Sequence, residues 1–174
     1  SHTPQELRDQ WKEKFGFSCT IGYGLSEAPS GVTRLRHDRE YVPESAGHAL
    51  APVDIEIFDE EGTHLPTDSL GEICISPRQH GPWKGVWSPM LGYWRKPKET
   101  VEALKDNRLH TGDIGLKNKD DHLIVIGRLS DVIVRGGANI HPTEIERVLL
   151  SFPVVDEAAV IGVPDQRLGE KVYA

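Results

Sequence analysis

The chain has 174 residues, a formal net charge of −7 and 37% apolar residues. This length suffices for one domain with a sizeable core, or for parts of two. The spread-out acidic residues argue against a general nucleic-acid-binding surface. No apolar run approaches the roughly eighteen residues of a membrane-spanning helix, and the first residues lack a signal-peptide pattern. We therefore expect a cytoplasmic protein.

The first 30 residues predict a helix, a strand and a loop. Residues 3–6 form a capping box with proline at the first helical position. Apolar residues follow at intervals of four, on one face: Leu7, Trp11 and Phe15. Residues 17–23 are predicted to be a buried strand, followed by a glycine-containing loop. This order is typical of the last layers of an α/β sheet, which needs more strands than precede it here. We expect residues 1–30 to be the end of a larger domain.

Over residues 31–128 the sequence pattern changes and predicts short strands of alternating polarity, at 53–59, 71–76 and 122–127. A small barrel or a folded antiparallel sheet accounts for them. The Pro- and Gly-rich loop 77–95 holds three of the four tryptophans and is either a covering flap or a packed surface loop. Residues 96–104 are predicted to form a short helix.

Residues 127–146, GRLSDVIVRGGANIHPTEIE, join two kinds of structure. Strand composition at 131–135 precedes a glycine pair, whose backbone reaches conformations that other residues avoid. Pro142 suits the first turn of a helix predicted over 142–151. Strands are expected at 154–164 and near the end of the chain. Residues 129–174 are therefore predicted to be a separate domain.

Cysteine and histidine spacing gives no sign of a metal site. Cys19 and Cys74 lie inside apolar, strand-like runs without C-x-x-C spacing. We expect buried thiols rather than a disulfide or metal ligands. The eight histidines show no paired-ligand spacing, so no structural metal is expected.

Two short motifs could carry chemistry. Tyr23-Gly24-Leu25-Ser26-Glu27 follows a predicted strand, where binding residues commonly lie. An aromatic ring can stack on a base, a hydroxyl can donate to phosphate, and a carboxylate suits a hard cation. In Thr111-Gly112-Asp113 the carboxylate could accept two hydroxyl donors at once. The alternatives are a plain turn for the first motif, and a turn aspartate before a strand for the second.

In their order along the chain, these stretches resemble the adenylate-forming (AMP-binding) superfamily, in particular its acyl-CoA synthetases, the carboxylate–CoA ligases. The hinge of that family reads Gly-Arg-x-(Lys/Asp)-Asp, strand, Gly-Gly, Asn-Ile, x-Pro-x-Glu-Ile-Glu. Residues 127–146 match it except at Ser130, which replaces the charged pivot residue. The resemblance implies an α+β fold: the β-rich, distorted-barrel end of the large domain plus a truncated α+β C-terminal domain.

The resemblance also implies roles for the two short motifs. Tyr23 would lie against adenine, with Gly24 in the same loop. Ser26 would hydrogen-bond a phosphate oxygen, and Glu27 would hold Mg²⁺ bridging the triphosphate. Asp113 would accept hydrogen bonds from both ribose hydroxyls.

Further roles follow for the hinge. Arg128 would lie near the ribose and phosphate, Ser130 would occupy the pivot position, and Asp131 would be the hinge aspartate that follows it. Gly136 and Gly137 would line the tunnel for the pantetheine arm of CoA, since a glycine pair lets a thin arm pass along backbone.

The implied activity is ATP-dependent activation of a carboxylic acid as acyl-AMP, followed by transfer of the acyl group to CoA. ATP or AMP, Mg²⁺, CoA and the acid would be the small-molecule partners. The family's phosphate loop and catalytic lysine do not occur in these 174 residues, and Lys171 does not match that lysine. No catalytic residue is therefore assigned, and we expect the chain alone to be an inactive fragment.

Two other functions remain open. The parent protein could deliver the acyl group to a carrier protein instead of CoA. The chain could also be a short, non-catalytic binding module, in which an uncovered apolar face marks a partner site. The sequence indicates neither the acid nor the oligomeric state.

Overall fold

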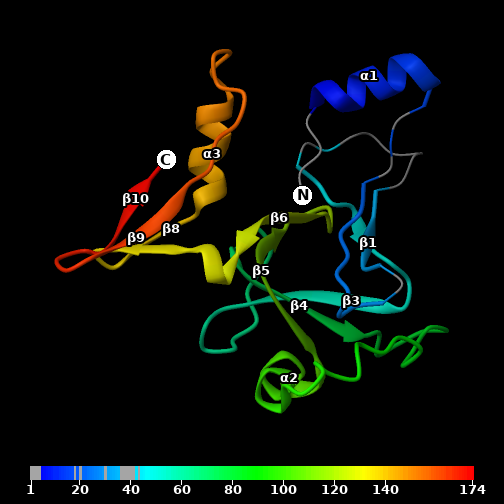
Figure 1. Cartoon of the computed structure of the whole chain (residues 1–174). Helices are drawn as coiled ribbons and strands as arrows, with labels where there is room; N and C mark the ends of the chain where they lie inside the picture. The colour runs from blue at the N-terminus through cyan, green and yellow to red at the C-terminus, as the bar shows by residue number, and fades with distance from the viewer. Residues whose placement is uncertain (1–4, 18, 20, 30, 36–41, 43) are drawn as a thin grey trace.

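The structure is a computed structural model that describes residues 5–17, 19, 21–29, 31–35, 42 and 44–174. It combines helices with antiparallel sheets (Figure 1), so the expected strand-rich α+β class is confirmed. Among the described residues, no helix has the length and apolar character needed to cross a membrane.

The largest sheet has the order β3-β4-β5-β6, with every neighbouring pair antiparallel. Its strands are β3 (Val53–Phe58), β4 (Gly71–Pro77), β5 (Leu109–Lys117) and β6 (Leu123–Arg128). Alternate apolar residues point into one core because side chains alternate across a strand. The core members on these strands include Val53, Ile55, Ile57, Ile73, Ile75, Leu109 and Leu123. The predicted strands correspond to β3, β4 and β6, whereas β5 was not predicted.

Shorter elements surround this sheet. The two-residue strands β1 (Thr33–Arg34) and β2 (His48–Ala49) pair with each other. Helix α2 (Pro97–Ala103) agrees with the short helix predicted at 96–104, and the 3-10 turn η1 (Lys105–Asn107) leads from it to β5. In loop 77–95 Trp87 is buried and its indole Nε1 donates to the Pro29 carbonyl oxygen at 3.3 Å, whereas Trp83 and Trp94 are exposed.

A second sheet, of order β8-β7-β10-β9, follows the turn η2 (Leu129–Asp131). Figure 1 shows it beside α3 and apart from the β3–β6 sheet. Its elements are β7 (Ile133–Arg135), β8 (Ala138–Ile140), α3 (Pro142–Leu150), β9 (Ile161–Asp165) and β10 (Gly169–Tyr173). Pro142 begins the helix as expected. The strand predicted at 154–164 is too long at its start, since only Ile161–Asp165 pairs with β10.

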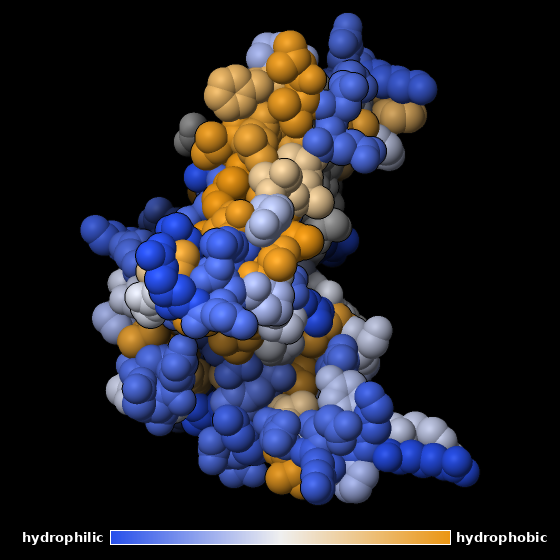
Figure 2. All heavy atoms as spheres, turned by 60° about the vertical axis from the view of Figure 1, so that its left-hand side comes forward, coloured by the Kyte–Doolittle hydropathy of each residue, from blue (hydrophilic) through white to orange (hydrophobic). Residues whose placement is uncertain are grey.

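Exposed apolar side chains gather on α1 and near α3, among other places. Helix α1 (Gln5–Phe15) exposes the predicted apolar face: Leu7, Trp11 and Phe15. Figure 2 shows a broad apolar region over the part of the molecule that contains α3. Exposed apolar side chains there include Val148, Leu150, Phe152 and Val154.

Two expectations for the N-terminal region are wrong. The described residues of 17–23 form no strand, and Phe17 is exposed. The Ile21 carbonyl accepts a hydrogen bond from the Leu35 N–H, and the Tyr23 carbonyl accepts from the Val32 and Thr33 N–H groups, which is an irregular pattern rather than a strand ladder. Both cysteines are free, but only Cys74 is buried, whereas Cys19 is half-buried. The capping residues Thr3 and Pro4 lie outside the described residues.

Candidate functional site

A cavity of about 370 Å³ lies where α1, the loop after it, the β5–β6 edge and the start of α3 meet. We call it the Asp113 cavity. Its lining comes from distant parts of the chain: Arg8, residues 21–25, residues 44–46, Asp113, residues 125–128 and Thr143. It therefore includes the predicted site residues Tyr23, Gly24, Asp113 and Arg128.

The carboxylate of Asp113 is the electrostatic centre of this cavity. Asp113 lies on β5 directly opposite Arg128 of β6, and Arg128 Nε is 3.0 Å from Asp113 Oδ1. The hydroxyl of Tyr23 donates to Asp113 Oδ2 at 2.5 Å. Asp113 is only 6% exposed, but each carboxylate oxygen accepts about two hydrogen bonds. Beyond these two contacts, each oxygen keeps acceptor capacity for a ligand.

Tyr23 stays protonated at neutral pH. Burial raises the pKa of its hydroxyl far above the ordinary value, and the hydrogen bond to Asp113 raises it further. The half-buried Tyr23 therefore acts as a permanent donor to Asp113.

The position of Asp113 results from a bulge in β5. Glu72 of β4 pairs with Ile114, and Cys74 pairs with His110, so Ile73 faces the whole of Thr111–Asp113. Gly112 has φ +69, a conformation that glycine adopts without steric cost. Bulges commonly redirect side chains beside functional sites. This bulge places Asp113 toward Tyr23 and Arg128.

Ser26 and Glu27 lie outside the lining of the Asp113 cavity. Glu27 instead faces the loop 77–95: its Oε1 accepts a 2.8 Å hydrogen bond from the Tyr93 hydroxyl, and its carbonyl accepts from Met90 N–H. Burial, and then the hydrogen bond to Glu27, raise the pKa of Tyr93.

Four hinge residues, Ser130, Asp131, Gly136 and Gly137, are also outside this lining, whereas the hinge residue Arg128 is part of it. Ser130 Oγ donates to the neighbouring Asp131 Oδ1 at 2.8 Å within η2. Gly136 and Gly137 form the turn between β7 and β8, with φ +61 and +86. The Gly136 N–H donates to the Leu168 carbonyl at 2.7 Å.

Sequence reasoning missed several residues around the cavity. Arg8 lines it and is 9% exposed, although it lies beside Leu7 in a helix with a predicted apolar face. Glu44 lines it and forms an ion pair with Arg147 of α3, and Thr143 reaches it from the first turn of α3. The Glu44–Arg147 pair joins residues 103 positions apart, so no local pattern could have identified it.

A second cavity, of about 600 Å³, lies along β2, β3 and β4. It is larger but contains none of the motif residues. Several of its charges are already paired: Arg78 with Asp54 at 3.1 Å, and Lys117 with Asp121 at 3.1 Å. The smaller Asp113 cavity is therefore the better candidate site.

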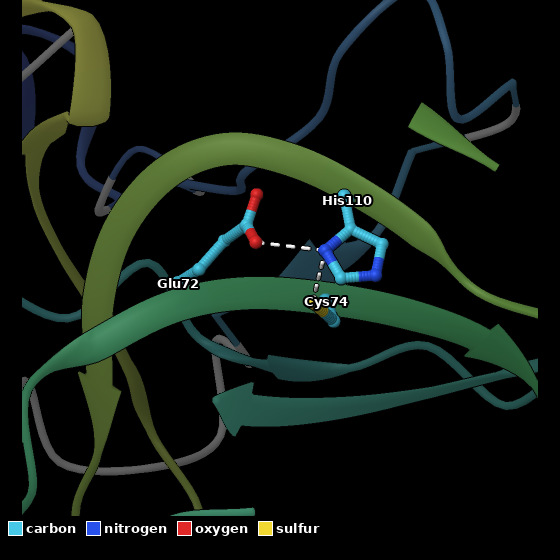
Figure 3. Close-up of side chains that lie close together, drawn as sticks. All are labelled: Glu72, Cys74 and His110. Atoms are coloured by element: carbon cyan, nitrogen blue, oxygen red, sulfur yellow. Dashed lines mark hydrogen bonds and ion pairs between the residues drawn. The ribbon is translucent and has the colours of Figure 1, made fainter. Parts of the chain in front are cut away.

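A cluster of three possible metal ligands lies between β4 and β5: Glu72, Cys74 and His110 (Figure 3). Their ligand atoms all lie within 4.8 Å of one another, although the spacing of cysteines and histidines in the sequence did not predict a metal site. The residues come from facing strands, so their spacing along the chain gives no signal. His110 Nδ1 lies 2.7 Å from Glu72 Oε2 and 3.5 Å from Cys74 Sγ. Burial raises the pKa of Cys74 to about 12, with a smaller contribution from Glu72. The contacts of His110 Nδ1 with the carboxylate and with the thiol make these three side chains a polar cluster between β4 and β5.

Two family models match the chain. "AMP-binding enzyme" matches residues 1–94, and "AMP-binding enzyme C-terminal domain" matches residues 144–174. The matched ranges lie on either side of β5 and β6, which carry Asp113 and Arg128.

Curated relatives and solved structures agree with these matches. The chain is 38% identical over 170 residues to a feruloyl-CoA synthase from Amycolatopsis sp, covering 96% of this chain and 32% of the relative. It is 36% identical to ScoC, a fatty acid–[acyl-carrier-protein] ligase from Streptomyces coeruleorubidus, covering 87% and 28%. The crystal structure of ATP-bound MatB from Rhodopseudomonas palustris superposes with a TM-score of 0.79 at 33% identity, covering 96% and 32%. The chain thus spans about a third of the length of these proteins.

Proposed function

The chain belongs to the AMP-binding enzyme family, and from this premise we propose that it carries the ribose-binding and hinge segments of an acyl-CoA synthetase. The whole protein would activate a carboxylic acid with ATP to give acyl-AMP and pyrophosphate. It would then transfer the acyl group to the thiol of CoA, releasing AMP. The convergence of Tyr23, Asp113 and Arg128 in one cavity carries this proposal.

Asp113 would bind the ribose of the nucleotide. Its two oxygens are fixed from opposite sides by Tyr23 and Arg128, at 2.5 and 3.0 Å, which leaves acceptor capacity for the two vicinal hydroxyls. Arg128 is positively charged and largely exposed, so it could also attract a phosphate. A hydrogen bond to a charged group contributes about 1.5–3 kcal/mol, which corresponds to roughly ten-fold to a hundred-fold in affinity.

Mg²⁺ would be held by Glu27. Magnesium keeps several waters and commonly uses one or two carboxylates together with substrate phosphates, so a single carboxylate is compatible. Glu27 is half-buried and bonded to Tyr93 through one oxygen. When bound, the ion would supply charge neutralisation for the triphosphate.

CoA would pass along the turn at Gly136 and Gly137. A Cβ added at Gly137 would meet no atom within 4 Å, and one at Gly136 would meet only Leu168 at 3.8 Å. The flank of this turn is open to a thin ligand such as the pantetheine arm. Ser130, in place of the usual charged pivot residue, would still allow rotation at η2 because a small side chain imposes little steric barrier.

A carrier protein is the second candidate acceptor, favoured by the 36% identity to ScoC. The test is acyl transfer by the full-length protein, supplied with ATP, Mg²⁺, a panel of carboxylic acids and either CoA or an acyl carrier protein. We expect CoA thioesters, and their loss in Asp113→Ala. Thioesters formed only on the carrier protein would favour the second candidate. Absence of any ATP–pyrophosphate exchange with the full panel would contradict both.

A further inference from the structure

The carboxylate of Glu72 holds the β5 bulge at two points. Its Oε2 lies 2.7 Å from His110 Nδ1, and its Oε1 accepts a 3.1 Å hydrogen bond from the Gly112 N–H. These two donors flank Thr111, and the second immediately precedes Asp113. Figure 3 shows the Glu72 side chain reaching toward His110 on the neighbouring strand. One side chain therefore spans the segment that turns Asp113 into its cavity.

The bulge needs such a contact because the regular ladder is interrupted there. The pairing of β4 with β5 jumps from Glu72–Ile114 to Cys74–His110, so the backbone groups between them lack regular partners. Thr111 supplies the other support: its Oγ donates to the Ile73 carbonyl at 2.7 Å and accepts from the Asp113 N–H at 3.0 Å. Buried polar groups left without partners are costly. Glu72 satisfies the Gly112 donor and the His110 donor together.

We propose that Glu72 is a positioning residue: its carboxylate fixes the Thr111–Asp113 bulge so that Asp113 meets the ribose hydroxyls of an adenine nucleotide. This inference rests on the proposed function. Glu72 does not line the Asp113 cavity and acts on the nucleotide only through Asp113.

A metal ion held by Glu72, Cys74 and His110 is the competing explanation for this cluster. The two oxygens of the Glu72 carboxylate are already engaged with the bulge: Oε1 with the Gly112 N–H at 3.1 Å and Oε2 with His110 Nδ1 at 2.7 Å. The positioning role therefore requires no ion and no rearrangement of these contacts.

The test compares AMP with 2′,3′-dideoxy-AMP, which lacks both ribose hydroxyls, by calorimetric titration into wild type and variants of this chain. Glu72→Ala removes both contacts, whereas Glu72→Gln keeps an acceptor for Gly112. Glu56→Ala is the matched control, because Glu56 also faces a histidine, His64 at 3.9 Å, but lies on β3 outside the Asp113 cavity. Circular dichroism checks the fold of each variant.

Wild type and Glu56→Ala should prefer AMP by at least about ten-fold. In Glu72→Ala this preference should fall nearly to one, with an intermediate value in Glu72→Gln. A general loss of stability would weaken both nucleotides equally and leave the ratio unchanged, which would overturn the proposal. If Glu72→Ala does not fold, Glu72→Gln decides the question by the same criterion.

A second readout needs no nucleotide and separates this inference from the proposed function. Burial is the larger cause of the raised Tyr23 pKa and the hydrogen bond to Asp113 is the second, so release of Asp113 should lower the pKa of Tyr23 part of the way toward the ordinary value. The change is followed by tyrosinate absorbance against a Tyr23→Phe reference. An unchanged Tyr23 titration in Glu72→Ala would overturn the positioning role. If wild type fails to discriminate the nucleotides but the Tyr23 titration shifts, ribose binding fails as a function while Glu72 still positions Asp113.

Discussion

The hydroxyl of Tyr23 donates a 2.5 Å hydrogen bond to Oδ2 of Asp113, which lies ninety residues later in the chain. This contact joins the irregular segment after α1 to the bulge of β5. It orients a carboxylate that Arg128 holds from the other side at 3.0 Å. The candidate site therefore depends on tertiary pairing between two short motifs.

Replacing Tyr23 by phenylalanine should destabilise the chain. The variant loses a hydrogen bond to a charged acceptor, which contributes about 1.5–3 kcal/mol. Urea denaturation followed by circular dichroism measures the difference, with the exposed Tyr173→Phe as control. An equal stability of Tyr23→Phe and wild type would show that the hydroxyl contributes nothing.

The stability difference between wild type and Tyr23→Phe should also depend on pH. The pKa of Tyr23 is raised from 10.0 in the folded chain, so the folded state holds this proton more tightly than the unfolded state. The resulting stabilisation is fully present below pH 10.0 and is lost as the pH rises toward the folded-state pKa. The stability difference between wild type and Tyr23→Phe should therefore shrink as the pH rises above 10.0. A difference that stays constant to strongly alkaline pH would contradict the raised pKa.

The two thiols should react at different rates. Burial raises the pKa of Cys74 to about 12, and its side chain is almost inaccessible, whereas Cys19 is half-buried. Since the thiolate is the reactive form, a thiol reagent at neutral pH should modify Cys19 rapidly and Cys74 only after unfolding. The native Cys19→Ser variant should therefore react slowly. Rapid modification of that variant would contradict the burial of Cys74 beside His110.

Gly47 should tolerate no side chain. Its φ is +91, and an added Cβ would lie 2.1 Å from the Arg34 carbonyl carbon and 2.3 Å from its oxygen. Gly62 is the matched control, because it has φ +79 but nothing within 4 Å of an added Cβ. We expect Gly62→Ala to cost about 1–2 kcal/mol and Gly47→Ala more than about 4 kcal/mol, measured by urea denaturation. Equal costs would mean that the close approach of the two backbones is absent.

The ion pair between Glu44 and Arg147 should restrain α3 and the β8-β7-β10-β9 sheet beside it while adding little stability. It joins the cavity lining to α3, and both side chains are substantially exposed. An exposed pair contributes at most about 1 kcal/mol. A double-mutant cycle with Glu44→Ala and Arg147→Ala should give a coupling energy within that limit. In the same variants, proteolysis at the exposed Arg135 should be faster, and unchanged cleavage would argue against the restraint.

Local sequence patterns, namely the alternation of apolar residues and the positions of prolines, predicted much of the fold. Strands β3, β4 and β6 have alternating apolar residues, and α2 and α3 begin at prolines that suit a first helical turn. Strand β5 escaped prediction because Thr111-Gly112-Asp113 interrupts its alternation. That interruption is the bulge that positions Asp113, so the local departure from strand pattern coincides with the candidate site.

Amino-acid composition gave a wrong prediction for a segment whose burial depends on tertiary contacts. Residues 17–23 are apolar enough for a buried strand, but their described part forms no strand and Cys19 is half-buried. The contacts of Glu72 with His110 and Gly112 join residues about forty apart. Their proximity depends on the register of two strands and on the bulge between them, which no spacing in the sequence reveals.

The most direct measurement is a calorimetric titration of AMP, and of a non-hydrolysable acyl-AMP mimic, into this chain and its Asp113→Ala variant. Asp54→Ala serves as control, because Asp54 is paired with Arg78 and lies outside the Asp113 cavity. We predict saturable binding that Asp113→Ala weakens at least about ten-fold and Asp54→Ala leaves unchanged. Equal binding by wild type and Asp113→Ala, with both folded by circular dichroism, would contradict the assignment of Asp113 as the ribose-binding residue.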